Sequence, residues 1–255
     1  MKPFAFTAVA VIPARYNSTR FPGKVLASIH GKPMVQHVFE RVRRSSYLSD
    51  VFIATDDDRV AEAVRGFKGK VIKTSSEHPS GTDRVAEIAE RMEVDLVVNV
   101  QGDEPLVDAK AIDEALECFT RPEAVDIATL ALPITEARDI LDPNVVKVYI
   151  DSYGYATFFS RSPLFSLELK KQGKVRHYQL LAYRHVGLYA YRREVLLALA
   201  SLPPTEVEKM DRLEQFRALE HGYRIRVVET NYPSYGVDTP KDLEKVNTVM
   251  AGTSS

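Results

Sequence analysis

The sequence predicts an α/β fold, because short apolar strands and amphipathic helices alternate through its first half. Apolar, β-branched runs predict buried strands at Ala8–Pro13, Val51–Ala54 and Val94–Asn99. Helical periodicity between these runs predicts helices at Met34–Arg43, Arg59–Phe67 and Asp83–Met92. This alternation is typical of a parallel sheet with right-handed crossovers and helices on both faces.

The second half is richer in strands. Apolar runs predict strands at Ile127–Leu132, Val145–Ile150, Ala156–Phe159, Val186–Tyr191 and Ile225–Val228. Helices are expected at Met210–His221 and Pro240–Met250, and Thr239 can cap the second of them. The polar segment Phe165–Lys174 is expected to be an exposed excursion. There is no internal repeat and no linker rich in Gly, Ser and Pro. We therefore expect residues 1–255 to form one domain with a β-rich lobe at about residues 130–200.

Composition excludes several classes of partner. Of the 255 residues, 45% are hydrophobic and 27% charged, with a net charge of −1 and no basic stripe, which argues against nonspecific binding to nucleic acid. No apolar segment approaches the roughly 20 residues needed to cross a bilayer. The N-terminal apolar run ends in Pro13 and Arg15, unlike a signal peptide, and a single cysteine, Cys118, cannot form an internal disulfide. We expect a cytoplasmic protein without nucleic-acid or membrane partners.

Parallel sheets bind ligands in the loops at the carboxyl ends of their strands. Here those loops are Ala14–Lys24, Thr55–Asp58 and Val100–Pro105, all polar or charged. The first loop combines three cations, two hydroxyls and a glycine: Arg15, Arg20, Lys24, Ser18, Thr19 and Gly23. Such donors suit a triphosphate, although the spacing is not that of a Walker loop. By position alone, a phosphate site and a solvated basic turn are equally good interpretations.

Motifs along nearly the whole chain resemble one bacterial enzyme family. They are Ile12–Arg15, Ser18–Arg20, Pro22–Lys24, Ala54–Asp56, Ser80–Arg84, Asn99–Pro105, Tyr155–Arg161, His185–Tyr189, Leu213–Gln215 and Gly236–Thr239. In this order they resemble the 3-deoxy-manno-octulosonate (Kdo) cytidylyltransferases. The match loosens at Ser162–Phe165, where many relatives carry Ile-Pro. A set of motifs in register is far more specific than any one of them.

The resemblance implies the three-layer, Rossmann-like mixed sheet of the nucleotide-diphospho-sugar transferases and a homodimer built partly from the β-rich lobe. It implies transfer of CMP from CTP to the anomeric hydroxyl of Kdo, giving CMP-Kdo for lipopolysaccharide synthesis and pyrophosphate, with Mg²⁺ as cofactor. The implied catalytic residues are Arg15, Lys24, Asp103 and Asp238, the two aspartates being metal ligands. Without the resemblance, Asp238 is better interpreted as a turn or helix cap, and Asp103 equally well as turn or ligand.

The resemblance also implies the substrate contacts. Nucleotide contacts fall on Ala14, Arg15, Ser18, Lys24, Ser80, Thr82, Arg84 and Gln101, and sugar contacts on Arg161, His185, Tyr189, Glu214 and Gln215. The planar fork of Arg161 suits the Kdo carboxylate. Taken singly, these residues have structural explanations: Ser80 or Thr82 can cap a helix, and His185 can be a core histidine. We interpret Asp56–Asp58 as a charged helix start rather than a metal site.

Two other functions fit the same residues. One is a cytidylyltransferase for another acidic sugar, such as sialic acid or a Kdo analogue. The other is a nucleotide-binding regulator without catalytic activity, which should lack a metal carboxylate or the phosphate cation. Because Asp103, Asp238, Arg15 and Lys24 are all present, the enzyme is the better interpretation.

Overall fold

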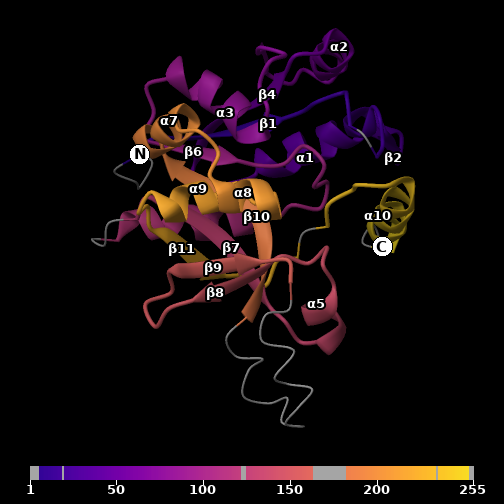
Figure 1. Ribbon diagram of the computed structural model, residues 1–255. Coiled ribbons are helices and arrows are strands. Elements are labelled where there is room, and N and C mark those ends of the chain that lie inside the picture. The colour runs from indigo at the N-terminus through magenta and orange to yellow at the C-terminus, as the bar shows by residue number, and fades with distance from the viewer. Residues whose placement is uncertain (1–5, 19, 122–124, 163–181, 234, 253–255) are drawn as a thin grey trace.

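A computed structural model describes residues 6–18, 20–121, 125–162, 182–233 and 235–252 (Figure 1). The predicted excursion Phe165–Lys174 and the side chain of Thr19 lie outside the described residues. The strands are β1 (Ala8–Pro13), β2 (Ser28–Ile29), β3 (Lys32–Pro33), β4 (Leu48–Thr55), β5 (Val71–Lys73), β6 (Leu96–Asn99), β7 (Ile127–Pro133), β8 (Lys147–Ile150), β9 (Ala156–Ser160), β10 (Ala182–Arg192) and β11 (Ile225–Glu229).

The helices lie mostly between these strands. They are α1 (Met34–Val42), α2 (Asp58–Gly66), α3 (Gly81–Glu90), α4 (Ala109–Glu117), α5 (Ala137–Leu141), α7 (Arg193–Ser201), α8 (Glu206–Asp211), α9 (Gln215–Glu220) and α10 (Pro240–Gly252), with short 3-10 helices η1 (Lys24–Leu26) and η2 (Cys118–Thr120). Among the described residues, no helix is both long enough and apolar enough to span a membrane.

One mixed sheet organises the molecule. Its order is β11-β7-β10-β6-β1-β4-β5, and β8 and β9 extend it beyond β10. Neighbouring strands are parallel from β6 through β1 and β4 to β5, whereas β10 runs antiparallel to both β6 and β7. The β8–β9 hairpin and α5 form the lower part of Figure 1, where the β-rich lobe was expected. The prediction of an α/β fold on a mixed sheet is confirmed.

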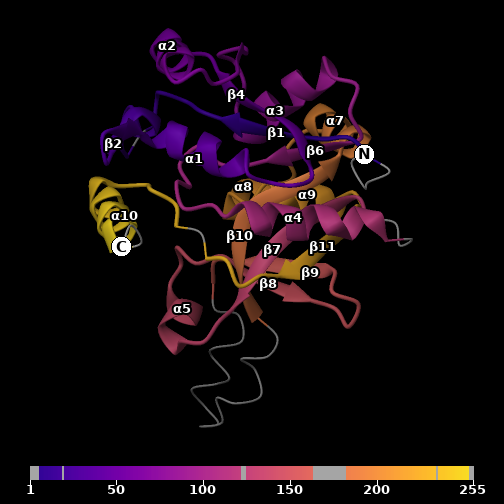
Figure 2. The same ribbon diagram turned by 180° about the vertical axis from the view of Figure 1, so that it is seen from behind.

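Helices cover both faces of the sheet, making three layers (Figures 1 and 2). On one face, α1, α2 and α4 bury side chains such as Val38, Val60 and Ile112 against even-numbered β1 residues such as Ala10. On the other, α3, α7 and α9 pack against odd-numbered β1 residues such as Val11. Every residue of β1 is buried, so the strand reads as one continuous apolar run.

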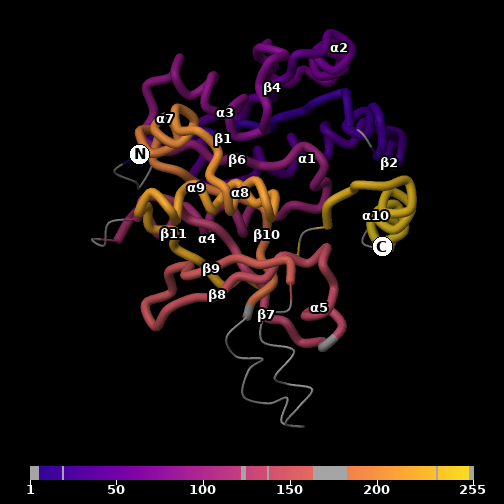
Figure 3. The backbone as a smooth tube through the Cα atoms, in the orientation of Figure 1, coloured from indigo at the N-terminus to yellow at the C-terminus, as the bar shows by residue number. Residues whose placement is uncertain are grey.

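The parallel register brings three loops to one edge of the sheet. Pro13 of β1 lies beside Ala54 of β4, and Val11 lies beside Asn99 of β6. The segments that follow these strands therefore begin together, as the switch-point rule predicts. The last helix reaches the same region from the far end of the chain, because α10 lies beside β2 (Figure 3). Val237 and Val246 pack against Ile29 there.

Local capping residues explain several boundaries. Asp57 caps α2 by accepting from the amide of Arg59, which confirms the interpretation of the aspartate run as a charged helix start. Ser80 caps α3 in a capping box with Asp83. Thr239 Oγ1 accepts from the amide of Asp242 in the first turn of α10, as expected.

The single helix predicted at Met210–His221 is wrong. Arg212 adopts a left-handed conformation with φ of 54°, and this ends α8 at Asp211 before α9 begins at Gln215. The amide of Arg212 still bonds the carbonyl of Glu208, as in a left-handed helix cap. Sequence reasoning also missed α7, which follows a strand that it did find.

Candidate functional site

The loop after β1 folds back on itself to present Lys24. The amide of Gly23 donates to the carbonyl of Tyr16 at 2.7 Å, and Gly23 has φ of 72°. A Cβ at this glycine would lie 3.1 Å from the Tyr16 ring, so both conformation and space favour glycine. The guanidinium of Arg59 covers the same ring at 3.4 Å from its centroid. The turn is therefore held on two sides, and Lys24 begins η1 directly after it.

Lys24 lies between the two predicted metal ligands. Its Nζ is 2.5 Å from Asp103 Oδ2 and 3.0 Å from Asp238 Oδ1. Burial opposes the charged ammonium, yet the two carboxylates together raise the pKa of Lys24 above its ordinary value. Arg20 lies 3.0 Å from the other oxygen of Asp238. Residues far apart in the sequence thus form one charged cluster at the predicted edge of the sheet.

Backbone contacts hold the two aspartates together. The amide of Val237 donates to the carbonyl of Asp103 at 2.9 Å, which ties the loop before α10 to the loop after β6. Val237 is fully buried, and this anchors its neighbour Asp238. On the other side, a Cβ at Gly102 would lie 2.8 Å from the carbonyl oxygen of Pro13. A glycine at this position lets the Asp103 loop approach the end of β1.

The residues predicted to bind nucleotide occupy the adjoining loops. Arg15 Nη1 donates to the carbonyl of Pro79 at 3.1 Å, and its buried Nη2 has no partner among the described residues. Ala14 is buried at the end of β1, and Ser18 is half-buried in the loop. An unpaired buried guanidinium nitrogen is costly unless something binds it, and a phosphate oxygen would do so.

The Ser80 loop meets Gln101 across the end of β6. Thr82 Oγ1 accepts from Asn99 Nδ2 at 3.4 Å, and Gln101 Nε2 donates to Asn99 Oδ1 at 3.3 Å. Arg84 differs from these residues, because it is fully buried. It pairs with Asp56 at 3.2 Å and hydrogen-bonds Thr74 Oγ1. The structure shows Arg84 supporting this loop from the interior, and its direct contact with a nucleotide stays a prediction.

His185 is the clearest member of the predicted sugar set. Thr129 donates its hydroxyl to the carbonyl of Leu188 at 2.8 Å, so its oxygen accepts from His185 Nε2 at 3.0 Å. Burial lowers the pKa of His185 to about 3, which keeps the ring neutral near pH 7. With Nε2 protonated, Nδ1 is left as an acceptor. The ring packs against Phe159 and Tyr189, which fix its plane.

Three other predicted sugar residues, Tyr189, Glu214 and Gln215, line a small cavity. It has a volume of about 20 Å³, enough for one water, and Thr82, Tyr191 and Arg217 complete its polar lining. Burial raises the pKa of Glu214 and, with Tyr191 nearby, that of Tyr189. The amide nitrogen of Gln215 is buried without a partner among the described residues. The cavity thus adjoins the Ser80 loop, so the predicted nucleotide and sugar residues meet here.

Arg161 lies apart from that cavity. Its guanidinium donates to the carbonyl of Asp211 at 3.3 Å and to that of Pro143 at 3.4 Å. Both acceptors are backbone oxygens, and among the described residues the guanidinium of Arg161 forms no ion pair with a carboxylate. The structure does not bring Arg161 into contact with the other predicted sugar residues.

A larger cleft of about 940 Å³ opens beside Asp238. Its lining joins the start of α10 to the α5 region and β10, and includes Arg20, Asn144, Arg184, Tyr235 and Asp238. Sequence reasoning missed Arg184 and Tyr235, which lie together with the guanidinium 5.9 Å from the ring centroid. The available signal was position, because Arg184 directly precedes the His185 motif and Tyr235 directly precedes the Gly236 motif.

Two carboxylates are enough for a magnesium ion that also binds water and substrate, but too few for a metal held by protein ligands alone. The described residues contain no group of three or more His, Cys, Asp and Glu side chains that could hold a metal. Mg²⁺, however, commonly takes one or two carboxylates and completes its shell with water and substrate phosphates. Asp103 and Asp238 already converge on one cation, and their side chains remain 26% and 48% exposed.

Comparison with known proteins agrees with this geometry. Residues 9–225 match the family model described as Cytidylyltransferase. The chain is 56% identical over 241 residues to the 3-deoxy-manno-octulosonate cytidylyltransferase of Geobacter sulfurreducens, covering 93% of this chain and 96% of that one. It is 50% identical over 246 residues to the protein of the same name from Trichlorobacter lovleyi, covering 95% and 98%.

Solved structures give the same answer. A CMP:2-keto-3-deoxy-manno-octonic acid synthetase complexed with CTP matches with a TM-score of 0.87 and 42% identity, covering 97% of this chain and 99% of that one. The 4-diphosphocytidyl-2C-methyl-D-erythritol synthase of Anaerococcus prevotii, with a TM-score of 0.62 and 13% identity, shares the fold alone. The chain belongs to the 3-deoxy-manno-octulosonate cytidylyltransferases, within the wider cytidylyltransferase family.

Proposed function

We propose that this chain transfers CMP from CTP to the anomeric hydroxyl of Kdo, giving CMP-Kdo and pyrophosphate. The observation that carries the proposal is the cluster of Lys24, Asp103 and Asp238 at the carboxyl edge of the sheet. It lies in a chain whose relatives at 50–56% identity are named for this activity. The combination of one cation and two carboxylates suits a site for metal-bound triphosphate.

The proposed reaction is an in-line displacement at the α-phosphorus. The hydroxyl oxygen of the sugar forms the new bond to the α-phosphorus and loses its proton to water, and the bond from that phosphorus to the α,β-bridging oxygen breaks, releasing pyrophosphate. Lys24 and the unpaired nitrogen of Arg15 would neutralise the charge that develops on the leaving group. The reaction needs positioning and charge neutralisation rather than a covalent enzyme intermediate.

We assign the carboxylates of Asp103 and Asp238 to Mg²⁺. Bound there, the ion would add positive charge at the α-phosphate and lower the pKa of the attacking hydroxyl. The contribution of the chain is to hold both carboxylates within reach of Lys24, helped by the Val237–Asp103 backbone bond. As Mg²⁺ prefers hard oxygen ligands, EDTA should abolish turnover and Mg²⁺ should restore it.

The remaining residues would orient the two substrates. Thr82 lines the cavity and is linked through Asn99 to Gln101, and the loop at residues 80–82 and Gln101 would contact the cytidine. His185 Nδ1 offers an acceptor to a sugar hydroxyl, and the unpartnered amide of Gln215 offers a donor. Arg161 would bind the Kdo carboxylate if the acceptor extends from the cavity towards the lobe.

We further propose a cytoplasmic homodimer. In support of the dimer, β9 pairs with β8 alone along its length in the described sheet, and its Phe158 is 39% exposed. In support of the compartment, the one cysteine, Cys118, is free and buried, which is typical of reducing conditions. Light scattering after size exclusion tests the dimer, and Phe158→Glu should then give a monomer.

The activity test is release of pyrophosphate from CTP and Mg²⁺ with a panel of sugars: Kdo, its amino analogue, sialic acid and a sugar phosphate. Kdo-dependent release is expected. Release with sialic acid alone would show that the acceptor is sialic acid rather than Kdo. If CTP binds but no acidic sugar gives pyrophosphate release, the proposed enzymatic activity is contradicted and a nucleotide-binding regulator is favoured.

A further inference from the structure

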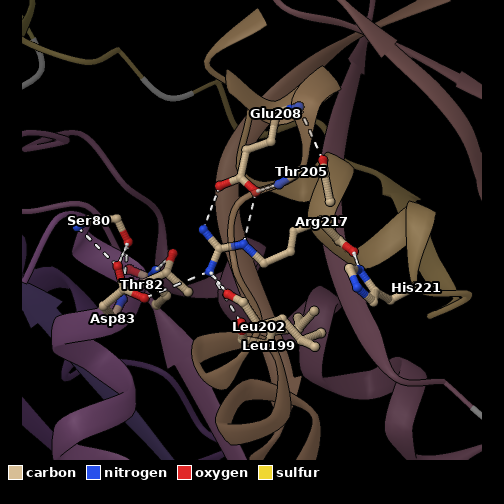
Figure 4. A network of polar contacts seen from close by, with 10 residues as sticks. Ser80, Thr82, Asp83, Leu199, Leu202, Thr205, Glu208, Arg217 and His221 are labelled. Atoms are coloured by element: carbon tan, nitrogen blue, oxygen red, sulfur yellow. Dashed lines mark hydrogen bonds and ion pairs between the residues drawn. The ribbon is translucent and has the colours of Figure 1, made fainter. Parts of the chain in front are cut away.

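Two helix starts of the same design lie on either side of one buried arginine (Figure 4). At α8, Thr205 Oγ1 accepts from the amide of Glu208 at 3.3 Å, and the Glu208 carboxylate accepts from the amide of Thr205. At α3, Ser80 Oγ accepts from the amide of Asp83 at 3.1 Å, and Asp83 Oδ2 accepts from the amide and hydroxyl of Ser80. Each start is a capping box with a carboxylate in its first turn.

Arg217 of α9 joins the two boxes. Its Nη2 lies 2.5 Å from Glu208 Oε1 and its Nε donates to Oε2 at 2.9 Å, a two-pronged pairing. Its Nη1 lies 3.9 Å from Asp83 Oδ1 and donates to the carbonyl of Leu199 at 3.2 Å. Arg217 and Glu208 are 8% and 7% exposed. Every nitrogen of the guanidinium thus has an acceptor or a carboxylate beside it.

The start of α3 and helix α9, which Arg217 joins in this way, carry the two halves of the proposed site. Asp83 closes the loop that begins at Ser80 and includes Thr82, beside Gln101. Arg217 lies one turn after Glu214 and Gln215, and both of these line the small cavity together with Thr82 and Arg217. A shift of α9 relative to α3 would move Arg217 away from Asp83 and change that cavity.

We propose that Arg217 is a positioning residue that couples binding of CTP at the loop 80–83 to binding of the sugar beside Glu214. This inference rests on the proposed function. Breaking a buried ion pair leaves an uncompensated charge, so the two elements keep one relative position. A ligand that orders one element therefore orders the other with it, so the second ligand binds an element that is already in place. Such coupling is reciprocal, because each substrate changes the affinity for the other by the same factor.

Calorimetry on the full chain measures this factor directly. Kdo is titrated into the protein in the presence of Mg²⁺, once with and once without α,β-methylene-CTP. The methylene bridge of this analogue prevents release of pyrophosphate. The ratio of the two Kd values is the coupling factor, and couplings of this kind are typically 5–150-fold. Asp83→Asn removes the charge facing Arg217 but keeps an oxygen that can accept from Ser80. We expect it to lower the factor towards one, a loss of at least about fivefold at the low end of that range.

A matched control lies on the same helix. Glu208→Gln and Glu206→Gln are the same chemical change two residues apart, but Glu206 is exposed and pairs only with Lys209 among the described residues. Glu208→Gln should lower the coupling factor as Asp83→Asn does, and Glu206→Gln should leave it unchanged. If Asp83→Asn does not fold, Arg217→Lys replaces it, since it keeps the charge but loses the fork.

Three results would overturn the inference: a wild-type factor of one, a folded Asp83→Asn with the wild-type factor, or an equal loss in Glu206→Gln. A lower melting temperature alone does not support it, because a merely structural ion pair would give that too. Pyrophosphate release by the wild-type chain is measured in parallel, so that failure of the inference can be told from failure of the proposed function. A wild-type chain that releases no pyrophosphate with Kdo fails the function, whereas one that does, with coupling unaltered in the variants, fails the inference alone.

Discussion

The two ends of the candidate site treat charge in opposite ways. At the phosphate end, Lys24, Asp103 and Asp238 pair with one another, and the two carboxylates are partly exposed. At the acceptor end, burial drives His185 and Glu214 towards their neutral forms: it lowers the pKa of the histidine and raises that of the glutamate. Full charges thus lie where a triphosphate would need matching, and the neutral His185 ring and the Gln215 amide lie where hydroxyl groups would bind.

The difference matters for what a substitution does. A partly exposed ion pair contributes little to folding, about 0–1 kcal/mol, so charges at the phosphate end can be removed without unfolding the chain. A buried polar group is different, because leaving it unpaired costs about 1–3 kcal/mol. We therefore expect variants at the phosphate end to lose turnover and variants at the acceptor end to change stability as well.

The largest effect should follow Asp103→Asn or Asp238→Asn. Loss of a preorganised charge at the reaction centre typically lowers turnover by about 10²–10³. The melting temperature should hardly change, because each side chain keeps its shape and loses only partly exposed pairings, with Lys24 in both cases and also with Arg20 for Asp238. Pyrophosphate release and thermal melting measure the two quantities. Normal turnover in either variant would remove that aspartate from the site.

A smaller effect should follow Gly102→Ala. The new Cβ would lie 2.8 Å from the Pro13 carbonyl oxygen, so the Asp103 loop has to shift. Overpacking of this kind costs about 1–3 kcal/mol, and the shift should also lower turnover. Gly236→Ala is the matched control next to Asp238, because nothing lies within 4 Å of its Cβ. Urea unfolding that gave both variants the same loss of stability would contradict the packing argument.

The pH dependence of stability tests the acceptor end. The pKa of His185 is about 3 in the folded chain, below its ordinary value of 6.5. The unfolded chain therefore binds a proton that the folded chain does not, and stability falls as pH drops from about 6.5 towards 3. By pH 5 the loss is at most about 2 kcal/mol.

His185→Gln removes this contribution and keeps an amide that can donate to Thr129. Its free energy of unfolding should fall less between pH 7.5 and pH 5 than that of the wild type. Denaturant titrations at the two pH values measure the difference. Parallel losses would mean that the ring is charged when folded, and the contrast between the two ends would no longer hold.

Gln215→Leu is the exception at the acceptor end, because little effect on stability is expected for it. Its amide nitrogen is buried without a partner among the described residues, so its removal should change the free energy of unfolding by less than about 1 kcal/mol. The KM for Kdo should nevertheless rise several-fold while kcat changes less. Gln36→Leu, which loses a 2.7 Å bond to Glu40, is the control and should leave KM unchanged. An unchanged KM in Gln215→Leu would remove it from the acceptor contacts.

Features with local causes were predicted well. The bounds of Ala8–Pro13 match β1 because the run of apolar residues ends where the strand ends. The caps at Asp57 and Ser80 were predicted because a capping side chain bonds an amide two or three residues away. The gathering of three polar loops at one edge followed from the parallel order of the strands.

Features that depend on distant contacts were not predicted. The left-handed turn at Arg212 divides a segment whose apolar spacing fits one helix, and periodicity carries no sign of it. The pairing of Arg217 with Asp83 joins residues more than a hundred positions apart. The convergence of Asp103 and Asp238 on Lys24 was expected only through the family resemblance, because no local rule relates the loop before α10 to the loop after β6.

The position of β10 has a consequence for synthesis of the chain. Strand β6 is wholly buried, and its outer neighbour is β10, which begins roughly 80 residues later in the sequence. At typical rates of about 5–20 residues per second, a ribosome needs about 4–16 s to make the intervening segment. During that time β6 presents an uncovered apolar edge, to which strands of other nascent chains can add. Chaperone dependence and aggregation should therefore be greatest for chains that stall before residue 182.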